Sequence, residues 1–344
     1  MPTSSRPVAL RVAVLVMLAG LLAGCVSREQ SSGAREAPPT VSLTELSDVT
    51  LQVGDQKGGT ESLLRAANAL DNLPYKVEFS TFSSGPPQIE AATAGKIDFA
   101  ITGNTPPIFG AASNAKVKVV SAYDGSGRGD KILVHDDAPL RTVADLRGKR
   151  IAVGKGSSAH GNVLAQLNRV GLSPSDVQLI FLQPADALGA FTQRQVDAWA
   201  VWDPYTAQAE AAIPVRSIAE ATGVTNGAGF GVASDEALAD PKRNTALSDL
   251  LVRYAKAVRW AEDNPDKWAQ SYSAAVGLDP KVGAEAQGRS LRLPVALSDQ
   301  LVGSEQELAD LFAKSKQISG APEFKKWVDN RYDSALSALY LTRS

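Results

Sequence analysis

The sequence is poor in the residues that build metal sites and disulfides: it has one cysteine, Cys25, and two histidines, His135 and His160, among 344 residues. One thiol cannot close an internal disulfide, and so few thiolate and imidazole ligands argue against a zinc site. The net charge of −2 leaves no basic excess for nucleic acid or for an anionic membrane surface. We therefore expect no metal, no cofactor and no nucleic-acid partner, in a chain long enough for two domains of about 150 residues each.

Long apolar runs are also scarce, and the clearest one lies near the N-terminus. Arg6 and Arg11 precede the apolar residues 12–22, a stretch too short for a spanning helix and typical of a secretory signal. The following Leu-Ala-Gly-Cys, residues 22–25, is similar to the bacterial lipobox, whose cysteine is lipidated and becomes the new N-terminus. An ordinary signal with a chance cysteine is the alternative.

From these features we expect a signal peptide over residues 1–24, then a lipidated Cys25 and a flexible tether over 25–47, which is rich in Ser, Ala, Pro and Glu. Acyl chains on one residue can hold a soluble domain at a membrane surface. The sequence therefore predicts an extracytoplasmic protein, lipid-anchored to the cell membrane.

From residue 49 onward, short apolar strands alternate with amphipathic helices, which is typical of an α/β fold with largely parallel sheets. Several strands end in a Gly- or Ser-rich turn that is followed by a helix start. These strand, turn and helix units begin near residues 51, 77, 97 and 150. A helix start has orphan N–H groups and the positive end of the helix dipole, so it suits an anion.

Two groups of such units predict two lobes that face each other across a cleft, with the ligand beyond the carboxyl ends of the strands. We expect the first lobe to comprise residues 48–134 and 229–344, and the second lobe residues 135–228. The chain would cross between the lobes near residues 126–135 and 228–233, which would form a two-segment hinge.

A set of short motifs, in order, resembles the substrate-binding proteins of bacterial ABC importers for aliphatic sulfonates, within the wider sulfonate/nitrate/taurine family. The motifs are Gln-Lys-Gly at 56–58, Ser-Gly-Pro at 84–86, Gly-Lys-Ile-Asp-Phe at 95–99, Thr-Gly-Asn-Thr-Pro-Pro at 102–107, Gly-Lys-Gly-Ser at 154–157 and Asp-Ala-Trp-Ala-Val-Trp-Asp-Pro-Tyr at 197–205. The resemblance implies a type II periplasmic-binding-protein fold, no enzymatic activity, and a monomer that captures an aliphatic sulfonate and delivers it to an ABC permease for sulfur acquisition.

The resemblance also implies a ligand site, carried over position by position: Gln56, Gly85, Thr102, Asn104, Ser157, Ser158, His160, Trp202 and Asp203. The chemistry agrees, because a permanently charged sulfonate needs hydrogen-bond donors rather than acids or nucleophiles. Backbone N–H groups at helix starts and the hydroxyls of Thr102 and Ser157 can supply them.

Some of these residues have simpler interpretations. The serines can serve only as helix caps, His160 can lie on a helix surface, and Lys57 can be solvated rather than bound to the anion. Trp199 is expected in the core and Trp202, at the strand end, in the pocket.

Three departures from the family pattern affect the choice of ligand. Asp55 would repel a simple sulfonate if it faced the cleft, Gly161 would enlarge the pocket, and Arg128 could add positive charge. Binding proteins for taurine, nitrate or a thiamine precursor are the alternatives. Asp55 or Asp203 would then pair with the ammonium group of taurine. Helix 61–70 is expected to be capped by the Thr60 hydroxyl.

Overall fold

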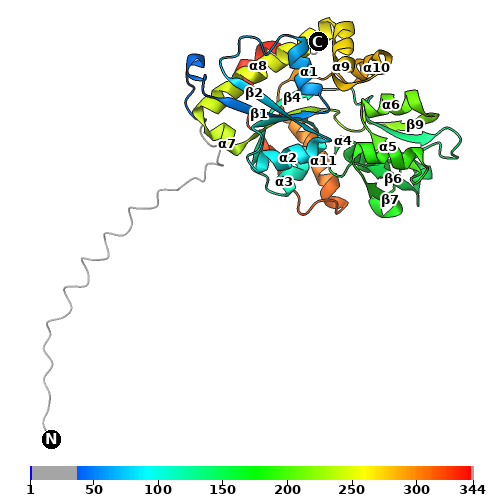
Figure 1. Ribbon diagram of the computed structural model, residues 1–344. Coiled ribbons are helices and arrows are strands. Elements are labelled where there is room, and N and C mark those ends of the chain that lie inside the picture. The colour runs from blue at the N-terminus through cyan, green and yellow to red at the C-terminus, as the bar shows by residue number, and fades with distance from the viewer. Residues whose placement is uncertain (2–36, 342–344) are drawn as a thin grey trace. The chain divides into compact units, whose positions relative to one another are not determined.

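Two β-sheets organise the part of the chain that the computed structural model describes, which is Met1 and residues 37–341 (Figure 1). Cys25 and the expected signal peptide, 1–24, lie outside the described residues. Among the described helices, none combines the length and the apolar character that crossing a membrane requires.

The first sheet has six strands in the order β11-β4-β10-β3-β1-β2. Their bounds are β1 Thr50–Gln56, β2 Lys76–Phe82, β3 Phe99–Gly103, β4 Val117–Asp124, β10 Gly229–Ser234 and β11 Leu293–Val295. The second sheet has five strands in the order β7-β6-β8-β5-β9. Their bounds are β5 Lys131–His135, β6 Arg150–Val153, β7 Gln178–Phe181, β8 Ala198–Val201 and β9 Val215–Glu220. Each sheet is the centre of one lobe of an α/β fold, as the sequence predicts.

Both sheets are mixed, and most strands of each run in one direction, as the sequence predicts. In the first sheet β1 is parallel to β2 and β3, whereas β10 is antiparallel to β3 and β4. In the second sheet β6 is parallel to β7 and β8, whereas β5 is antiparallel to β8 and β9. The antiparallel strands β5 and β10 are those that the chain enters directly after crossing from one sheet to the other. A strand reached by a short crossing, without a helical connection, need not run parallel to its neighbours.

Helices cover both faces of the first sheet (Figure 1). One apolar cluster joins α1 and the long α8 to the sheet, and another joins α2, α3 and α11 to its opposite face. A third cluster joins α4 and α5 to the second sheet. The helix bounds are α1 Gly59–Ala66, α2 Gly85–Thr93, α3 Thr105–Ala112, α4 Ser158–Arg169, α5 Pro184–Thr192, α6 Tyr205–Ala212, α7 Asp235–Ala239, α8 Pro241–Asp263, α9 Pro265–Val276, α10 Pro280–Ser290, α11 Asp299–Lys314 and α12 Asp333–Leu336.

The chain crosses between the sheets in two short segments, residues 125–130 and 221–228. The segments contact each other, because Ala221 N–H donates to the Asp130 carbonyl at 2.9 Å and Thr222 Oγ1 to the Ser126 carbonyl at 3.0 Å. Strand β5 pairs within the second sheet, so the second lobe begins at Lys131 and the expected boundary after residue 134 is wrong. Likewise, residues 229–233 form part of β10 rather than hinge, since their N–H and C=O groups are paired with β3 and β4.

The expected tether, residues 25–47, also ends earlier than predicted. Residues 43–45 form a short helical turn with a reciprocal capping box between Ser42 and Glu45. Leu46 is fully buried in the cluster around α8, and Val41 N–H donates to Thr245 Oγ1 at 3.2 Å. This segment is therefore part of the first lobe.

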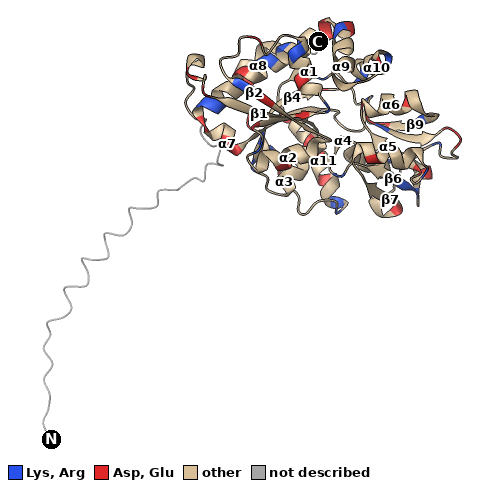
Figure 2. Cartoon of the chain, viewed as in Figure 1, with Lys and Arg blue, Asp and Glu red and all other residues tan. Residues whose placement is uncertain are grey.

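Acidic and basic residues are interspersed over both lobes (Figure 2). This mixing agrees with the small net charge of the sequence, −2.

Candidate functional site

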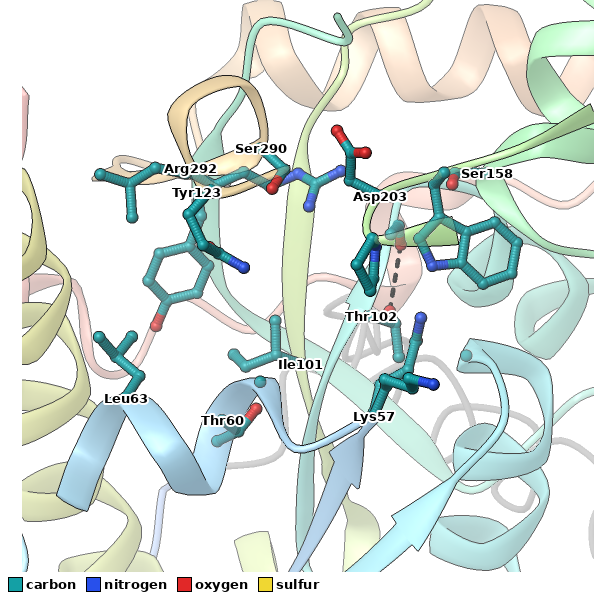
Figure 3. A pocket seen from close by; sticks show the side chains of 18 of the residues that line it. Lys57, Thr60, Leu63, Ile101, Thr102, Tyr123, Ser158, Asp203, Ser290 and Arg292 are labelled. Carbon is teal, nitrogen blue, oxygen red and sulfur yellow. Dashed lines mark hydrogen bonds between the residues drawn. The ribbon is translucent and has the colours of Figure 1, made fainter. Parts of the chain in front are cut away.

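A cavity of about 170 Å³ lies where the two lobes meet (Figure 3). Its lining comes from the ends of β1, β3 and β4, the starts of α1, α2 and α4, the turn after β8, and α8, α9 and α10. The carboxyl ends of the strands point to it, as expected for an α/β protein. Seven of the nine residues predicted for the site line this cavity: Gln56, Gly85, Thr102, Ser157, Ser158, Trp202 and Asp203. Asn104 and His160 lie outside its lining.

The starts of α2 and α3 lie against each other at one side of the cavity. Gly85 has no room for a side chain, because a Cβ atom there would be 2.5 Å from Pro106 Cγ. The Gly85 amide makes no backbone hydrogen bond within the described residues. Pro86 and Pro87 have no N–H, so this helix start offers one free amide rather than three. Asn104 Nδ2 instead donates to Asn226 Oδ1 of the second crossing segment, at 3.1 Å.

The start of α4 brings donors from the second lobe. Its N-cap residue, Ser157, makes no side-chain cap, because its hydroxyl donates to the Gly154 carbonyl at 2.7 Å. The amides of Ser158 and Ala159 therefore have no partner among the described residues. Thr102 likewise donates its hydroxyl to the Gly103 carbonyl, at 3.1 Å. The hydroxyls of Thr102 and Ser157 are thus already used, which corrects the expectation that they are free to rotate toward a ligand.

The start of α1 is occupied by the protein itself. Asp55 is buried, with 1% exposure, and its Oδ1 accepts the amides of Thr60 at 2.8 Å and Glu61 at 3.4 Å. Burial raises the pKa of Asp55, and these amides oppose the shift. Asp55 therefore does not face the cleft, and its carboxylate, rather than the Thr60 hydroxyl, caps α1.

Two cations line the cavity. Lys57 Nζ lies 5.0 Å from the centre of the Tyr205 ring, which belongs to the second lobe. Arg292, between α10 and β11, uses its Nε to donate to the Gly227 carbonyl of a crossing segment at 3.1 Å. No hydrogen bond to its terminal guanidinium nitrogens is found among the described residues. Arg292 was not predicted, and it stands in no recognisable motif. Arg128, which was considered for this role, points instead to the Gly288 carbonyl, at 3.2 Å.

The carboxylate in the lining, Asp203, is neutralised by a neighbour that sequence reasoning also missed. Arg289 of α10 donates to both Asp203 oxygens, at 2.6 and 2.9 Å, and to Glu210 Oε2 at 2.8 Å. The pair is buried, with side-chain exposures of 11% for Arg289 and 1% for Asp203. Burial raises the pKa of the Asp203 carboxyl, while Arg289 opposes that shift. This ion pair joins the two lobes. Arg292 in turn lies near the buried carboxyl of Asp130, where its charge opposes the rise that burial causes in the pKa of that carboxyl.

His160 lies in an aromatic cluster where the lobes meet. Its ring centre is 6.0 Å from that of Phe109, 5.1 Å from Phe312 and 5.3 Å from Phe181. Its Nδ1 accepts the Gly156 amide at 3.2 Å, while Nε2 makes no hydrogen bond within the described residues. Burial and the nearby Lys155 lower the pKa of His160 to about 3. The neutral ring therefore helps the lobes to pack.

Gly161 faces the same interface rather than the cavity, because a Cβ there would collide with Thr105 Oγ1 and come within 3.4 Å of Leu308. The expectation that it enlarges the pocket is therefore wrong. The two tryptophans of β8 and its end separate as predicted. Trp199 is in the core of the second lobe, and Trp202 lines the cavity.

Comparisons with known proteins agree with this architecture. The family described as NMT1/THI5 like matches residues 76–268, more than half of the chain. A Bacillus subtilis protein named putative aliphatic sulfonates-binding protein is 33% identical over 93% of this chain and 94% of its own length. The chain therefore belongs to the NMT1/THI5-like family, and the predicted relationship to aliphatic sulfonate-binding proteins is confirmed.

Solved structures show the same fold. The periplasmic aliphatic sulphonate binding protein SsuA from Escherichia coli matches with a TM-score of 0.72 and 29% identity, over 82% of this chain and 92% of that one. The alkanesulfonate-binding protein SsuA from Xanthomonas axonopodis pv. citri, bound to MOPS, matches with a TM-score of 0.76 and 31% identity, over 82% and 98%. Both relatives are named as binding proteins, in agreement with the prediction of a binding protein.

Proposed function

We propose that this protein captures a small organosulfonate between its two lobes, outside the cytoplasm, and delivers it to an ABC permease in the cell membrane. The observation that carries the proposal is the convergence of Lys57, Arg292 and the free amides of Gly85 and Ser158 on one cavity. The sulfonate-binding relatives from three bacteria support the ligand class. As part of the proposal, a lipid on Cys25 anchors a monomer to the membrane.

The donor chemistry favours a sulfonate over a phosphate. A sulfonate keeps one negative charge and no proton, so it needs donors and cations only. A phosphate monoester that carries a proton would also need an acceptor, and the carboxylate of the lining, Asp203, is already bonded to Arg289. Burial strengthens such charge-assisted hydrogen bonds, because the surroundings screen them less than water does.

The same contacts disfavour taurine and nitrate. The taurine ammonium would need a carboxylate, but Asp203 is paired with Arg289 and Asp55 caps α1. Nitrate would leave much of a cavity of about 170 Å³ unfilled, including an apolar part lined by Leu63, Val258 and Leu291. A sulfonate with an uncharged apolar tail fits both parts of the cavity.

Isothermal titration calorimetry with hexanesulfonate, taurine, sulfate and nitrate tests the proposal. We expect hexanesulfonate to bind most tightly, and Arg292→Gln to weaken it by roughly ten-fold or more, as for loss of a hydrogen bond to a charged group. Arg128→Gln is the matched control and should leave the affinity unchanged. Tighter binding of sulfate, nitrate or taurine, or equal affinities of the two arginine variants, would contradict the proposal.

A further inference from the structure

The cavity has a wall that an anionic head group does not need. Six of its residues share an apolar or aromatic side chain and come from α1, β4, α8 and α9 of the first lobe: Leu63, Tyr123, Tyr254, Val258, Trp268 and Tyr272. We call this set the aromatic wall. In Figure 3, Leu63 and Tyr123 lie at the opposite end of the cavity from Lys57, Thr102 and Ser158. The lining is therefore divided into a donor end and an aromatic end.

The aromatic wall is held in place by contacts of its own. The Trp268 indole Nε1 donates to Gln287 Oε1 at 3.0 Å, and its ring centre lies 5.4 Å from that of Tyr272. Tyr123 and Tyr254 meet edge to face, with ring centres 5.2 Å apart. Trp268, Tyr272 and Tyr123 are all nearly buried, with exposures of 2–4%. The rings therefore present a preformed surface, which binds a rigid partner at a smaller entropic cost than a flexible one.

The aromatic wall carries no charge of its own. Burial raises the pKa of the Tyr254 and Tyr272 hydroxyls well above their usual value, so both are neutral. The buried Tyr123 hydroxyl lies beside that of Ser121. A cationic tail would be repelled by Lys57 and Arg292, and Asp203 is already paired with Arg289. An uncharged tail avoids this penalty.

We propose that the aromatic wall is a tail subsite that selects sulfonates carrying an uncharged aromatic ring over those with a flexible alkyl chain of the same carbon number. This inference rests on the proposed sulfonate-binding function. An arene gains ring-to-ring contacts beyond the area that it buries. It also has no torsions to freeze, whereas a hexyl chain loses rotational freedom on binding.

The test compares benzenesulfonate with hexanesulfonate, which share a six-carbon tail and the same head group, by isothermal titration calorimetry on the purified protein. Methanesulfonate reports on the head group alone. We expect benzenesulfonate to bind roughly five-fold or more tightly than hexanesulfonate. Trp268→Leu should bring that ratio close to one, and Tyr272→Leu, on the neighbouring ring, is the second variant in case the first does not fold. Trp327→Leu is the matched control, because this tryptophan lies outside the cavity under Lys118.

The outcomes separate the two proposals. The tail subsite is overturned if the wild-type protein binds benzenesulfonate and hexanesulfonate with nearly equal affinity. It is also overturned if folded Trp268→Leu and Tyr272→Leu keep the wild-type ratio of the two affinities. Either outcome leaves sulfonate binding intact. A Trp327→Leu variant that loses the ratio would overturn it as well. Failure of all three sulfonates to bind would instead overturn the proposed function itself.

Discussion

The starts of α1 and α4 have similar local construction and opposite chemistry. Each follows a strand and a turn with a left-handed glycine, Gly58 in one lobe and Gly156 in the other. At α1 the Asp55 carboxylate takes the amides of Thr60 and Glu61. At α4 the Ser157 side chain turns away to the Gly154 carbonyl, and the first amides stay free. One helix start therefore stabilises the fold, whereas the other is available to a ligand.

The difference shows that a helix start after a glycine turn is not by itself an anion site. What decides is whether the chain provides its own acceptor, because an orphan amide is satisfied by whichever acceptor lies within reach. At α1 the acceptor, Asp55, precedes the left-handed Gly58 by three residues, near the end of a buried strand. In α2 two prolines reduce the number of donors instead. The donor end of the cavity therefore depends on one amide of α2, the amides of α4 and two cations.

The largest effect is expected when the Ser158 N–H, which is free at the start of α4, is removed. Ser158 is the first residue of α4, where proline is tolerated, and the preceding Ser157 is extended, as a residue before proline prefers. We expect Ser158→Pro to bind hexanesulfonate roughly 30-fold more weakly than Ser158→Ala, which loses only the hydroxyl, because the lost bond is to a charged group. Calorimetry measures the affinities, and circular dichroism checks the fold. Equal affinities of the two variants would show that the α4 amide does not hold the ligand.

The corresponding change at α1 removes the carboxylate that caps this helix. We expect Asp55→Ala to lower the free energy of unfolding by up to about 2 kcal/mol, because it leaves the α1 amides without their cap. Urea denaturation followed by circular dichroism measures this loss. The affinity for hexanesulfonate should stay within about two-fold of the wild-type value. A loss of affinity as large as that of Ser158→Pro would mean that the two helix starts do not differ in function.

A second buried carboxylate, Glu305 of α11, differs from Asp55 because fewer hydrogen-bond donors reach it. It accepts the Asn226 side-chain amide at 2.7 Å, and its other oxygen has no partner within the described residues. Burial raises the pKa of Glu305 from its ordinary 4.5 to about 8. Between these values the folded protein holds a proton that the unfolded chain has lost, so the free energy of unfolding falls as pH rises.

Glu305→Gln should remove this dependence. We expect the variant to gain about 2 kcal/mol on the wild-type protein between pH 6 and pH 8, as judged by urea denaturation at each pH. Below pH 4.5 the two proteins should differ little from this cause. A wild-type protein whose stability rises relative to the variant over pH 6–8 would contradict the assignment.

The smallest expected effect concerns the contact between the lobes beside α4. Gly161→Ala would place a methyl group against Thr105 Oγ1 and Leu308 of the first lobe. We expect the affinity for hexanesulfonate to fall about three-fold, because the methyl group opposes the approach of the lobes without touching the ligand. The double variant Gly161→Ala with Thr105→Ala should recover part of the loss, as calorimetry would show. If the double variant loses as much binding free energy as the two single variants lose together, this contact does not explain the weaker binding.

Several features were readable from the sequence because they are local. The strand, turn and helix units show where strands end and helices begin, so Gln56, Gly85, Thr102 and Ser158 could be placed at one site. Trp199 and Trp202 could be assigned to core and pocket from their positions on one strand. The family relationship followed from motifs that lie within a few residues of one another.

Other features depend on tertiary contacts and have no local signal. Residues 131–135 and 229–233 were expected in the hinge, yet they form β5 and β10, which pair with strands from distant parts of the chain. His160 stands in the right helix turn for a ligand contact, but Phe109 and Phe312 of the other lobe enclose it. Asp55 was read as a possible charge in the cleft, because a sequence does not show which way a buried carboxylate turns.

By itself, the sequence determined the α/β architecture, the family and the strand ends at which an anion could be held, since each follows from patterns within some 20 residues. Only the tertiary structure decided which groups complete the cavity. Arg292, the Arg289 partner of Asp203 and most of the aromatic wall come from residues 254–292, far along the chain from the strand ends at residues 56, 103 and 201 that they face. Such groups meet because two lobes pack together, and packing over that separation leaves no periodic mark in the chain.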